Sequence, residues 1–485
     1  MKILMRGAID PLLNMSSEQF IFENHTGGNI GNMIFTNSIT RSLLVDDNTT
    51  IDYFSAHREK PTKAWAERVN ATYDYFLIPL ANAFKVKNHE ELTLLRDFVK
   101  LLKIPCCVIG VGIQRQLSNQ RFSKYYKYND EARDFCKAVL EKSPMIGVRG
   151  EITGEFLKDL GFMPERDYTV IGCPSMFTWG DTLPEVKKTI LTKDSVVAFN
   201  SKIEFETLEK YQPFLEFEKK SMAQFPNMIY VQQQIDDIRM SYIDGLKPEL
   251  QDSKIYDLNK AVTFTNIPGW IDYFKKNVDF SFGSRIHGNV AAVLAGVPSL
   301  IVPFDQRVWE LAKYHNIPML LQQEIGKKET LFDLFERTDF DSVHKGHKER
   351  FAHYHDFLHK TLGLDTIYEH TYADDQTPYD KIAASREYPG VVRGWDALTD
   401  EEKIERGRSA ALFYRARFKE KNERLMEAKQ TIRDLSKEKQ QIKRHPFQWA
   451  FRQMKRKLRK KLGLSKKKKG KKKKGKPAKG KKAKG

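Results

Sequence analysis

Cysteine is scarce in this sequence. The 485 residues include four cysteines, Cys106, Cys107, Cys136 and Cys173. Their spacing matches neither the paired pattern of a zinc site nor the framework of a disulfide-rich secreted protein. We therefore expect reduced, structural thiols, which are typical of cytosolic proteins.

Long hydrophobic runs are also missing. No stretch of about 18 consecutive apolar residues occurs, so the sequence predicts no transmembrane helix. The apolar start from Met1 to Met5 is followed at once by Arg6 and Gly7, and is too short for a signal peptide. We interpret it as a first buried strand and expect a cytoplasmic protein.

Acidic residues are absent from the C-terminal end. Residues 443–485 contain 22 Lys or Arg and no Asp or Glu, whereas the other 442 residues hold 60 basic and 63 acidic side chains. The formal net charge of +19 therefore belongs to this segment. A uniformly basic, nucleic-acid-binding body is not predicted.

Within residues 443–485, apolar side chains recur at helical spacing among the basic ones. These are Phe447, Phe451, Met454, Leu458 and Leu462. The pattern indicates a basic amphipathic helix followed by a Lys-rich tail. Basic residues near an anionic leaflet contribute on the order of 1 kcal/mol each. We expect peripheral attachment to the inner face of a membrane, with nucleic-acid binding and a solvated tail as the alternatives.

Apolar segments of strand length alternate with helical segments up to residue 363. The expected strands are 20–22, 75–79, 106–112, 145–149 and 168–171 in the first half, then 196–199, 228–231, 262–264, 278–282 and 299–303. Such alternation predicts an α/β fold with parallel sheets. We expect Rossmann-like domains at residues 1–180 and 190–363, with a ligand cleft between the carboxyl ends of their strands.

The pattern changes after residue 363. Residues 364–400 are irregular and predict a linker or a strap over the body. In residues 401–442 a heptad repeat follows, with Ile404, Ala411, Phe418, Leu425 and Ile432 at seven-residue intervals. A coiled coil that makes a homo-oligomer and a long helix packed on the body both fit this repeat.

The loop from Gly27 to Asn32 contains three glycines and lies between an expected strand and an expected helix. Backbone N–H groups at such a position can bind an anion. It is neither a Walker A loop nor a GxGxxG loop, because the Lys-Ser/Thr pair and the glycine spacing are missing. A purely structural turn is the alternative.

A stronger signal is the sequence Ser284-Arg285-Ile286-His287-Gly288, which follows an expected buried strand and opens a helix. Arg285 would lie at the ligand-binding edge of the sheet, where a guanidinium suits carboxylate or phosphate. The positive end of the helix lowers the proton affinity of His287, and a bound phosphate would raise it. We therefore predict an anion site with an acid–base group, whereas simple helix capping is the alternative.

Arg149 ends another expected strand. A buried arginine needs an anion or a carboxylate, and an ion pair with Glu151 or Glu155 would satisfy it equally well.

Five histidines lie close together in the sequence near the end of the second half. They are His344, His347, His353, His355 and His359. Because Lys and Arg are interleaved with them and no cysteine joins them, we predict no metal site there.

Taken in order, these segments resemble the polysaccharide pyruvyltransferase family over roughly residues 27–318. The resemblance rests on Gly28-Asn29-Ile30-Gly31-Asn32, Ile146-Gly147-Val148-Arg149, Ile171-Gly172-Cys173-Pro174-Ser175-Met176-Phe177, Ser284-Arg285-Ile286-His287-Gly288 and Ala295-Gly296-Val297-Pro298. The last two segments, in this order and spacing, are the most specific.

The resemblance implies two Rossmann-like domains in a GT-B-like arrangement. It implies transfer of a pyruvyl group from phosphoenolpyruvate to a sugar of a surface polysaccharide or its lipid-linked precursor, commonly as a ketal. Arg285 and His287 would be catalytic, and no metal or cofactor would be needed. The substrate-binding residues would be Arg149, Gly28, Asn29, Gly31, Asn32, Ser284 and Gly288.

The chain departs from the family at two positions. Asn32 stands where members often have Asp, and Cys173 stands where many have Asp before Pro. Two other hypotheses stay open, and Asn32 bears on the second of them. One is a GT-B glycosyltransferase that uses a nucleotide sugar, and the other is a non-catalytic binding or scaffold protein with a decayed site.

Overall fold

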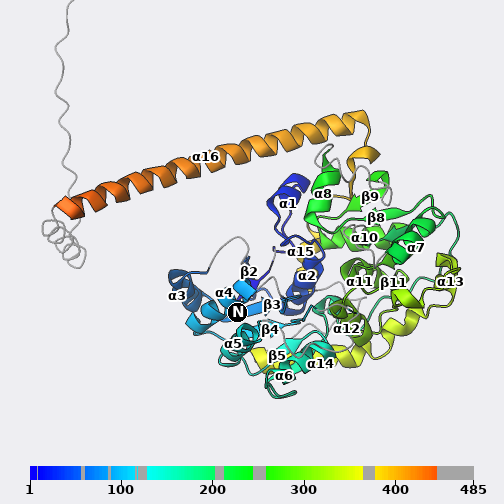
Figure 1. Cartoon of the computed structure of the whole chain (residues 1–485), viewed down its shortest axis with the longest axis horizontal. Helices are drawn as coiled ribbons and strands as arrows, with labels where there is room; N and C mark the ends of the chain where they lie inside the picture. Colours follow the sequence, from blue (N-terminus) through cyan, green and yellow to red (C-terminus); the bar gives the residue numbers. More distant parts are fainter. Residues whose placement is uncertain are drawn as a thin grey trace, which may run out of the picture. The chain divides into compact units, whose positions relative to one another are not determined.

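The computed structural model describes residues 1–7, 9–55, 61–85, 89–114, 117, 128–201, 212–243, 258–363 and 377–444 (Figure 1). Two compact units are present, Met1–Ala410 and Ala411–Gly485. The first contains both expected Rossmann-like domains, and the boundary between them stays a prediction.

A four-stranded parallel sheet forms the first half. Its strands are β1 (Lys2–Arg6), β2 (Thr50–Phe54), β3 (Tyr75–Pro79) and β4 (Cys106–Ile109), in the order β2-β1-β3-β4. Its helices are α2 (Asn32–Leu43), α3 (Lys63–Thr72), α4 (His89–Leu101) and α5 (Asn129–Leu140). The buried start of the chain is thus confirmed as a strand.

A short parallel pair, β5 (Ile146–Val148) and β6 (Tyr168–Val170), extends this half. A bridge between Val111 and Val148 joins it to the chain just after β4. Helix α6 (Glu151–Asp159) lies between the two strands and is followed by Gly161, whose φ of 95° suits a residue without a Cβ.

The second half is built on a six-stranded sheet in the order β11-β10-β7-β8-β9-β12. Its parallel strands are β7 (Val197–Phe199), β8 (Ile229–Val231), β9 (Ala261–Thr263), β10 (Phe280–Gly283) and β11 (Ser299–Ile301). The helices α7 (Gln212–Met222), α8 (Ile235–Tyr242), α10 (Ile267–Asn277), α11 (Ile286–Leu294), α12 (Gln306–Tyr314) and α13 (Leu331–Glu336) accompany them. The predicted α/β class with parallel sheets is confirmed.

One hydrophobic core runs through both halves. It includes Ile34 of α2, Val290 of α11 and Phe357 of α14 (His347–Leu362). Helix α14 returns the chain to the first half, where Cys107 Sγ lies 3.4 Å from Thr361 Oγ1. The two Rossmann-like halves therefore pack as one body.

The expected strand at residues 20–22 is wrong. This segment lies in helix α1 (Ser17–Glu23), and the Ser16 side chain caps the helix by accepting a hydrogen bond from the Gln19 N–H at 3.2 Å. Helix α1 packs against α8 (Figure 1). The glycine-rich loop thus connects two helices and does not follow a strand.

Part of the predicted strap, residues 377–400, is described. It contains α15 (Pro378–Ala384), which contacts α2 (Figure 1). It also contains β12 (Val392–Arg393), which pairs antiparallel with β9. Because β12 completes the second sheet, this segment belongs to the body's architecture and is more than a covering strap.

A single helix, α16 (Asp400–Arg444), contains the heptad positions. The side chains of Ile404, Phe418, Leu425 and Ile432 are all at least half exposed. The oligomer stays a prediction. The basic segment predicted to bind membranes lies outside the described residues, except for its first two positions. Within the described ranges, no helix is long and apolar enough to cross a membrane.

Candidate active site

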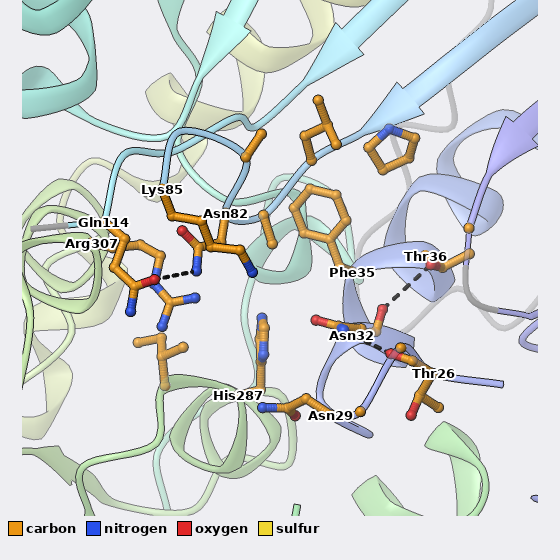
Figure 2. A pocket seen from close by; sticks show the side chains of 18 of the residues that line it. Thr26, Asn29, Asn32, Phe35, Thr36, Asn82, Lys85, Gln114, His287 and Arg307 are labelled. Carbon is orange, nitrogen blue, oxygen red and sulfur yellow. Dashed lines mark hydrogen bonds between the residues drawn. The ribbon is translucent and has the colours of Figure 1, made fainter. Parts of the chain in front are cut away.

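A cavity of about 400 Å³ lies in the first unit, at the carboxyl ends of both sheets (Figure 2). Its lining residues follow β1, β2, β3 and β4 in the first half and β8, β10 and β11 in the second. This is the edge at which parallel α/β sheets bind ligands. Arg285, His287, Gly28, Asn29 and Asn32 all line this cavity, and their roles stay predictions.

His287 lies in the first turn of α11 and faces the cavity (Figure 2). Its Nε2 atom has no hydrogen-bond partner among the residues that the structure describes. Burial, and then the charges of Arg149 and Arg307, lower the pKa of His287 to about 3. The imidazole is therefore neutral near pH 7 without a bound anion.

The strand-to-helix turn before His287 is held by close backbone contact. Gly283 has a φ of 147°, and a Cβ there would lie 2.8 Å from the backbone carbon of Asn200. A side chain at Gly288 would likewise collide with Gln233 and Asn200, at 2.7 and 2.9 Å. Gly288 is therefore a packing residue outside the cavity lining, and substrate binding by it is not supported.

Arg285 is anchored by the backbone of Ser201. Its Nε atom donates to the Ser201 carbonyl at 3.1 Å, and its Nη2 atom lies 3.7 Å from Asp237 Oδ2. The Ser201 hydroxyl accepts from the Ser284 N–H at 3.3 Å and donates to Glu218. Ser284 thus lies behind the cavity wall and helps to position Arg285.

The loop from Gly27 to Asn32, called the glycine loop below, contacts the second half. Ile30 N–H donates to the Gln233 carbonyl at 2.9 Å, and the Gly28 carbonyl accepts from Ile235 at 3.0 Å. Gly31 packs directly on His287, because a Cβ at Gly31 would lie 2.6 Å from both Cβ and Nδ1 of His287. The loop therefore sets the position of His287.

Two backbone N–H groups of the glycine loop already donate hydrogen bonds to nearby side chains. Gly28 donates to Asn24 Oδ1 at 2.7 Å, and Gly31 donates to Asn29 Oδ1 at 2.8 Å. Anion binding by these two groups is therefore a wrong expectation, since their hydrogens are committed to side chains.

Asn32 lines the cavity opposite His287 (Figure 2). Its Nδ2 atom donates to the Thr26 carbonyl at 2.8 Å. The Oδ1 atom is thereby the part of the amide that can accept a hydrogen bond from a ligand. A carboxylate at this position could not donate to Thr26, so the local backbone suits Asn.

Arg149 directly follows β5 and is fully buried. Its Nε and Nη2 atoms make no hydrogen bond within the described part of the chain. The alternative of an ion pair with Glu151 or Glu155 is wrong, because these residues pair with Lys313 and Lys158. The guanidinium instead lies 5.4 Å from the ring of Phe35, which lines the cavity.

Sequence reasoning missed several charged residues at the cavity. Arg307 and Lys85 line it, as do Arg6 and Glu91, which form an ion pair. Arg307 follows β11 at the ligand-binding edge of the sheet, and this position in the sequence could have identified it as a cavity residue. Lys85 lies in a segment without any informative pattern.

Glu310 was also missed. It lies on α12 and accepts hydrogen bonds from the Thr153 N–H at 3.0 Å and hydroxyl at 2.7 Å. Burial raises the pKa of Glu310 to about 7, whereas Thr153 and Arg149 act in the opposite direction. This carboxyl is therefore at most a partial counterion for Arg149 near neutral pH.

The histidine cluster has structural contacts. His347 Nε2 lies 3.1 Å from the Gly180 carbonyl, and His353 Nε2 lies 2.9 Å from Thr169 Oγ1. Among the described residues, no group of three His, Cys, Asp or Glu side chains could hold a metal ion.

The sequence matches a known protein family. The model of the family described as polysaccharide pyruvyl transferase matches residues 29–306, more than half of the 485 residues. The chain belongs to this family. The predicted resemblance is confirmed, and this polysaccharide pyruvyl transferase family member is a transferase enzyme. A search of curated proteins found no match.

Solved structures with a similar fold are distant from this polysaccharide pyruvyl transferase family member. UDP-GlcNAc 2-epimerase of Methanocaldococcus jannaschii is 11% identical, with a TM-score of 0.39 over 71% of this chain and 98% of that one. The Neisseria meningitidis UDP-GlcNAc 2-epimerase is 10% identical, with a TM-score of 0.35 over 79% and 98%. Acinetobacter baumannii MurG is 9% identical, with a TM-score of 0.31 over 73% and 95%.

Proposed function

We propose that the chain transfers the pyruvyl group of phosphoenolpyruvate to a saccharide of a surface polysaccharide or its lipid-linked precursor, forming a ketal. The observation that carries the proposal is Arg149, a fully buried guanidinium with two nitrogens lacking hydrogen bonds to any described residue. A buried, unpaired charge is costly, and a bound anion would offset that cost. Its electrostatic effect on His287 indicates that the anion would lie near this histidine.

Phosphoenolpyruvate suits such a site because it carries a carboxylate and a phosphate. Guanidinium groups bind both through paired N–H donors. Arg285 lines the cavity, and its hydrogen bond to Ser201 orients its remaining nitrogens. The two arginines come from different halves of the first unit, so a bound donor would link them.

The reaction needs a proton on C3 of the donor. Protonation of the C3 methylene makes C2 cationic, and a saccharide hydroxyl then adds to C2 and loses its proton. Phosphate leaves C2 with the bonding electron pair, and a second hydroxyl of the saccharide adds to C2 and loses its proton to close the ketal. The two hydroxyl protons balance the proton gained by C3 and the proton taken by phosphate.

In this proposal His287 moves these protons. Its neutral form can accept the proton of the attacking hydroxyl. The negative charge of a bound donor opposes the effect of Arg149 and Arg307 and raises the proton affinity of the ring. The imidazolium so formed can deliver a proton to C3.

Neutral amides line the remainder of the cavity. They are Asn29, Asn32, Asn82, Gln114, Gln233 and Gln234. Amide oxygens and N–H groups pair with sugar hydroxyls, which both donate and accept hydrogen bonds. We infer that this part of the cavity binds the saccharide acceptor, with Asn32 Oδ1 as one acceptor of a hydroxyl hydrogen.

Phosphate release tests the proposal. The full chain is incubated with phosphoenolpyruvate and a panel of hexosides, alone and in combination. We expect release that requires a saccharide and that is lost in Arg285→Ala and His287→Ala. Consumption of a nucleotide sugar without any turnover of phosphoenolpyruvate would favour a glycosyltransferase, and inactivity with both donors would favour the scaffold hypothesis.

A further inference from the structure

Two cations from opposite halves meet at the cavity in addition to the family's arginines. Lys85 follows β3 and α4 begins shortly after it, whereas Arg307 lies at the start of α12. Figure 2 shows both side chains reaching into the space above His287. The charge of Arg307 contributes to lowering the pKa of Lys85, and also that of His287.

Arg6 and Arg285, which also line the cavity, each have an acidic neighbour and a hydrogen bond to a backbone carbonyl. Arg6 pairs with Glu91 and donates to the Pro79 carbonyl at 3.0 Å. Arg285 donates to Ser201 and lies near Asp237, as described above. These contacts compensate part of their charge, although Arg6 Nε and Arg285 Nη2 have no hydrogen-bond partner among the described residues.

Lys85 and Arg307 donate to no backbone carbonyl within the part of the chain that the structure describes. The Lys85 ammonium makes no hydrogen bond or ion pair with the described residues, although it is more than half buried. Burial lowers the pKa of Lys85, the Glu91 carboxylate opposes this, and Arg307 and Arg6 lower it further. Arg307 has one contact of 3.4 Å with Asp305, whose other oxygen caps α12 through the Val308 N–H. Its buried Nε atom has no partner in the described ranges.

We propose that Lys85 and Arg307 form a phosphate-binding subsite, and that the phosphate of phosphoenolpyruvate occupies it. Two nearby cations repel each other until a dianion lies between them, so a phosphate relieves this repulsion and gains charge-assisted hydrogen bonds. The assignment to the donor rests on the proposed function. The shared chemistry is a phosphomonoester, which a glycosyl phosphate acceptor would also present.

The subsite gives phosphate a place distinct from the carboxylate. Arg149 lies over the ring of Phe35, which lines the cavity, and two of its nitrogens have no hydrogen-bond partner among the described residues. With the phosphate at Lys85 and Arg307, the carboxylate would face Arg149 or Arg285. C2 and C3 would then lie near His287, between the two anionic ends.

Direct binding measurements test the subsite. Calorimetric titrations of the full chain use inorganic phosphate, phosphoenolpyruvate and glucose 1-phosphate at constant ionic strength. The variants are Lys85→Met and Arg307→Gln, with Lys85→Arg as a charge-preserving variant. Lys100→Met and Arg68→Gln, at exposed positions of α4 and α3, are matched controls.

We expect Lys85→Met and Arg307→Gln each to weaken phosphate and phosphoenolpyruvate binding at least about tenfold, which is the effect of losing one charge-assisted contact. Lys85→Arg should retain most of the affinity, and the controls should equal the parent chain. Unfolding temperatures of the variants identify any loss of fold. If a variant does not fold, the test is the comparison of phosphate affinity between Lys85→Arg and the parent chain.

Unchanged phosphate affinity in a folded Lys85→Met chain would overturn the subsite. Weaker binding of glucose 1-phosphate with unchanged binding of phosphoenolpyruvate would overturn the assignment to the donor. Phosphate binding that depends on Lys85, together with no turnover of phosphoenolpyruvate, would leave the subsite standing and contradict the proposed function.

Discussion

At the scale of single residues, the site depends on how tightly His287 is enclosed. Gly31 packs on the ring from the first half, whereas burial, and then the charges of Arg149 and Arg307, keep the ring neutral. A histidine that is exposed to solvent would titrate near pH 6.5 and would be partly charged under ordinary conditions. Here the proton is expected only once an anion is bound.

The charge state of His287 gives the first prediction. In ¹³C-histidine-labelled protein, the resonance lost in His287→Gln should not titrate between pH 5 and 8, because its pKa is about 3. Addition of phosphoenolpyruvate at pH 7 should move it toward the imidazolium position, since the bound charge opposes the two arginines.

The outcome is decided by one comparison. A His287 resonance that titrates near pH 6.5 in the free chain would contradict the described burial. Insensitivity to phosphoenolpyruvate would contradict the proposed location of the donor beside the ring.

Gly31 gives the second prediction. Gly31→Ala places a Cβ 2.6 Å from the Cβ and Nδ1 atoms of His287, so the loop or the ring must move. We expect kcat to fall roughly a hundredfold, because acid–base catalysis depends on placement of the proton-transfer group. Gly390→Ala, where no atom lies within 4 Å, is the matched control and should retain full activity.

Arg285 and His287 were predictable because a polar segment that directly follows a buried strand falls at the ligand edge of a parallel sheet. Lys85 was not, since its position depends on the path of the chain after β3. The hydrogen bonds donated by the N–H groups of Gly28 and Gly31 could not be predicted from the sequence. No sequence pattern identifies Asn24 and Asn29 as their acceptors.

At the scale of elements, the segment after residue 376 is part of the site's support. Helix α15 clamps α2, the helix that begins with Asn32 at the cavity. The Arg41 side chain is buried in α2 and donates to both oxygens of Asp380, at 3.0 and 2.8 Å, and to the Thr178 carbonyl at 2.7 Å. The pair therefore joins three segments of the first unit.

The third prediction concerns this pair. Asp380→Ala leaves the Arg41 guanidinium buried without its carboxylate, which costs about 3 kcal/mol of the free energy of unfolding. Urea unfolding should register the loss as a lower midpoint with an unchanged slope. Asp396→Ala, at an exposed position of the same segment, should leave the midpoint unchanged. Equal midpoints for both variants would show that the Arg41–Asp380 pair contributes nothing to the free energy of unfolding.

The strands β1, β3, β4 and β10 were predictable from apolar runs, whereas the five-residue strand β2 was missed. One further segment was assigned to the wrong type of element. Phe20-Ile21-Phe22 is too short to distinguish a strand from a buried helical turn. Ser16 and Gln19 stand at the spacing of a helix-capping pair, which was the available signal. The two-residue strand β12 gave no alternation at all, because its pairing with β9 is set by tertiary contacts.

At the scale of the whole molecule, buried ionisable groups give the body a defined pH optimum of stability. Burial lowers the pKa of His287 to about 3 and of His347 to about 4, and lowers that of His315 as well. The unfolded chain therefore binds more protons than the folded one below pH 6.5, and stability falls as the pH decreases from there.

Two buried carboxyls act in the opposite direction. Burial raises the pKa of Glu218 to about 8 and of Glu310 to about 7. Between about pH 4.5 and 8 the folded chain holds protons that the unfolded chain has lost, so stability falls as the pH rises through this window. Together the two sets of groups predict greatest stability near pH 6.

The fourth prediction uses Glu218. In Glu218→Gln the residue is neutral at every pH, so the decrease in unfolding temperature between pH 6.5 and 8 should become smaller. The difference in unfolding free energy is about 2 kcal/mol over this range, or a few degrees. Glu336→Gln, an exposed glutamate, is the control. Parallel pH curves for parent and Glu218→Gln would contradict a protonated Glu218.

The central claim is that phosphoenolpyruvate donates its three-carbon unit to a saccharide at the cavity between the two halves. The most direct measurement follows ¹³C-labelled phosphoenolpyruvate in ²H₂O, with the hexoside panel as acceptors. We predict a labelled ketal methyl group on the saccharide that carries one deuterium from protonation of C3, and none in His287→Ala. Labelled phosphoenolpyruvate that stays intact in the presence of every acceptor, while a nucleotide sugar is consumed, would contradict the account.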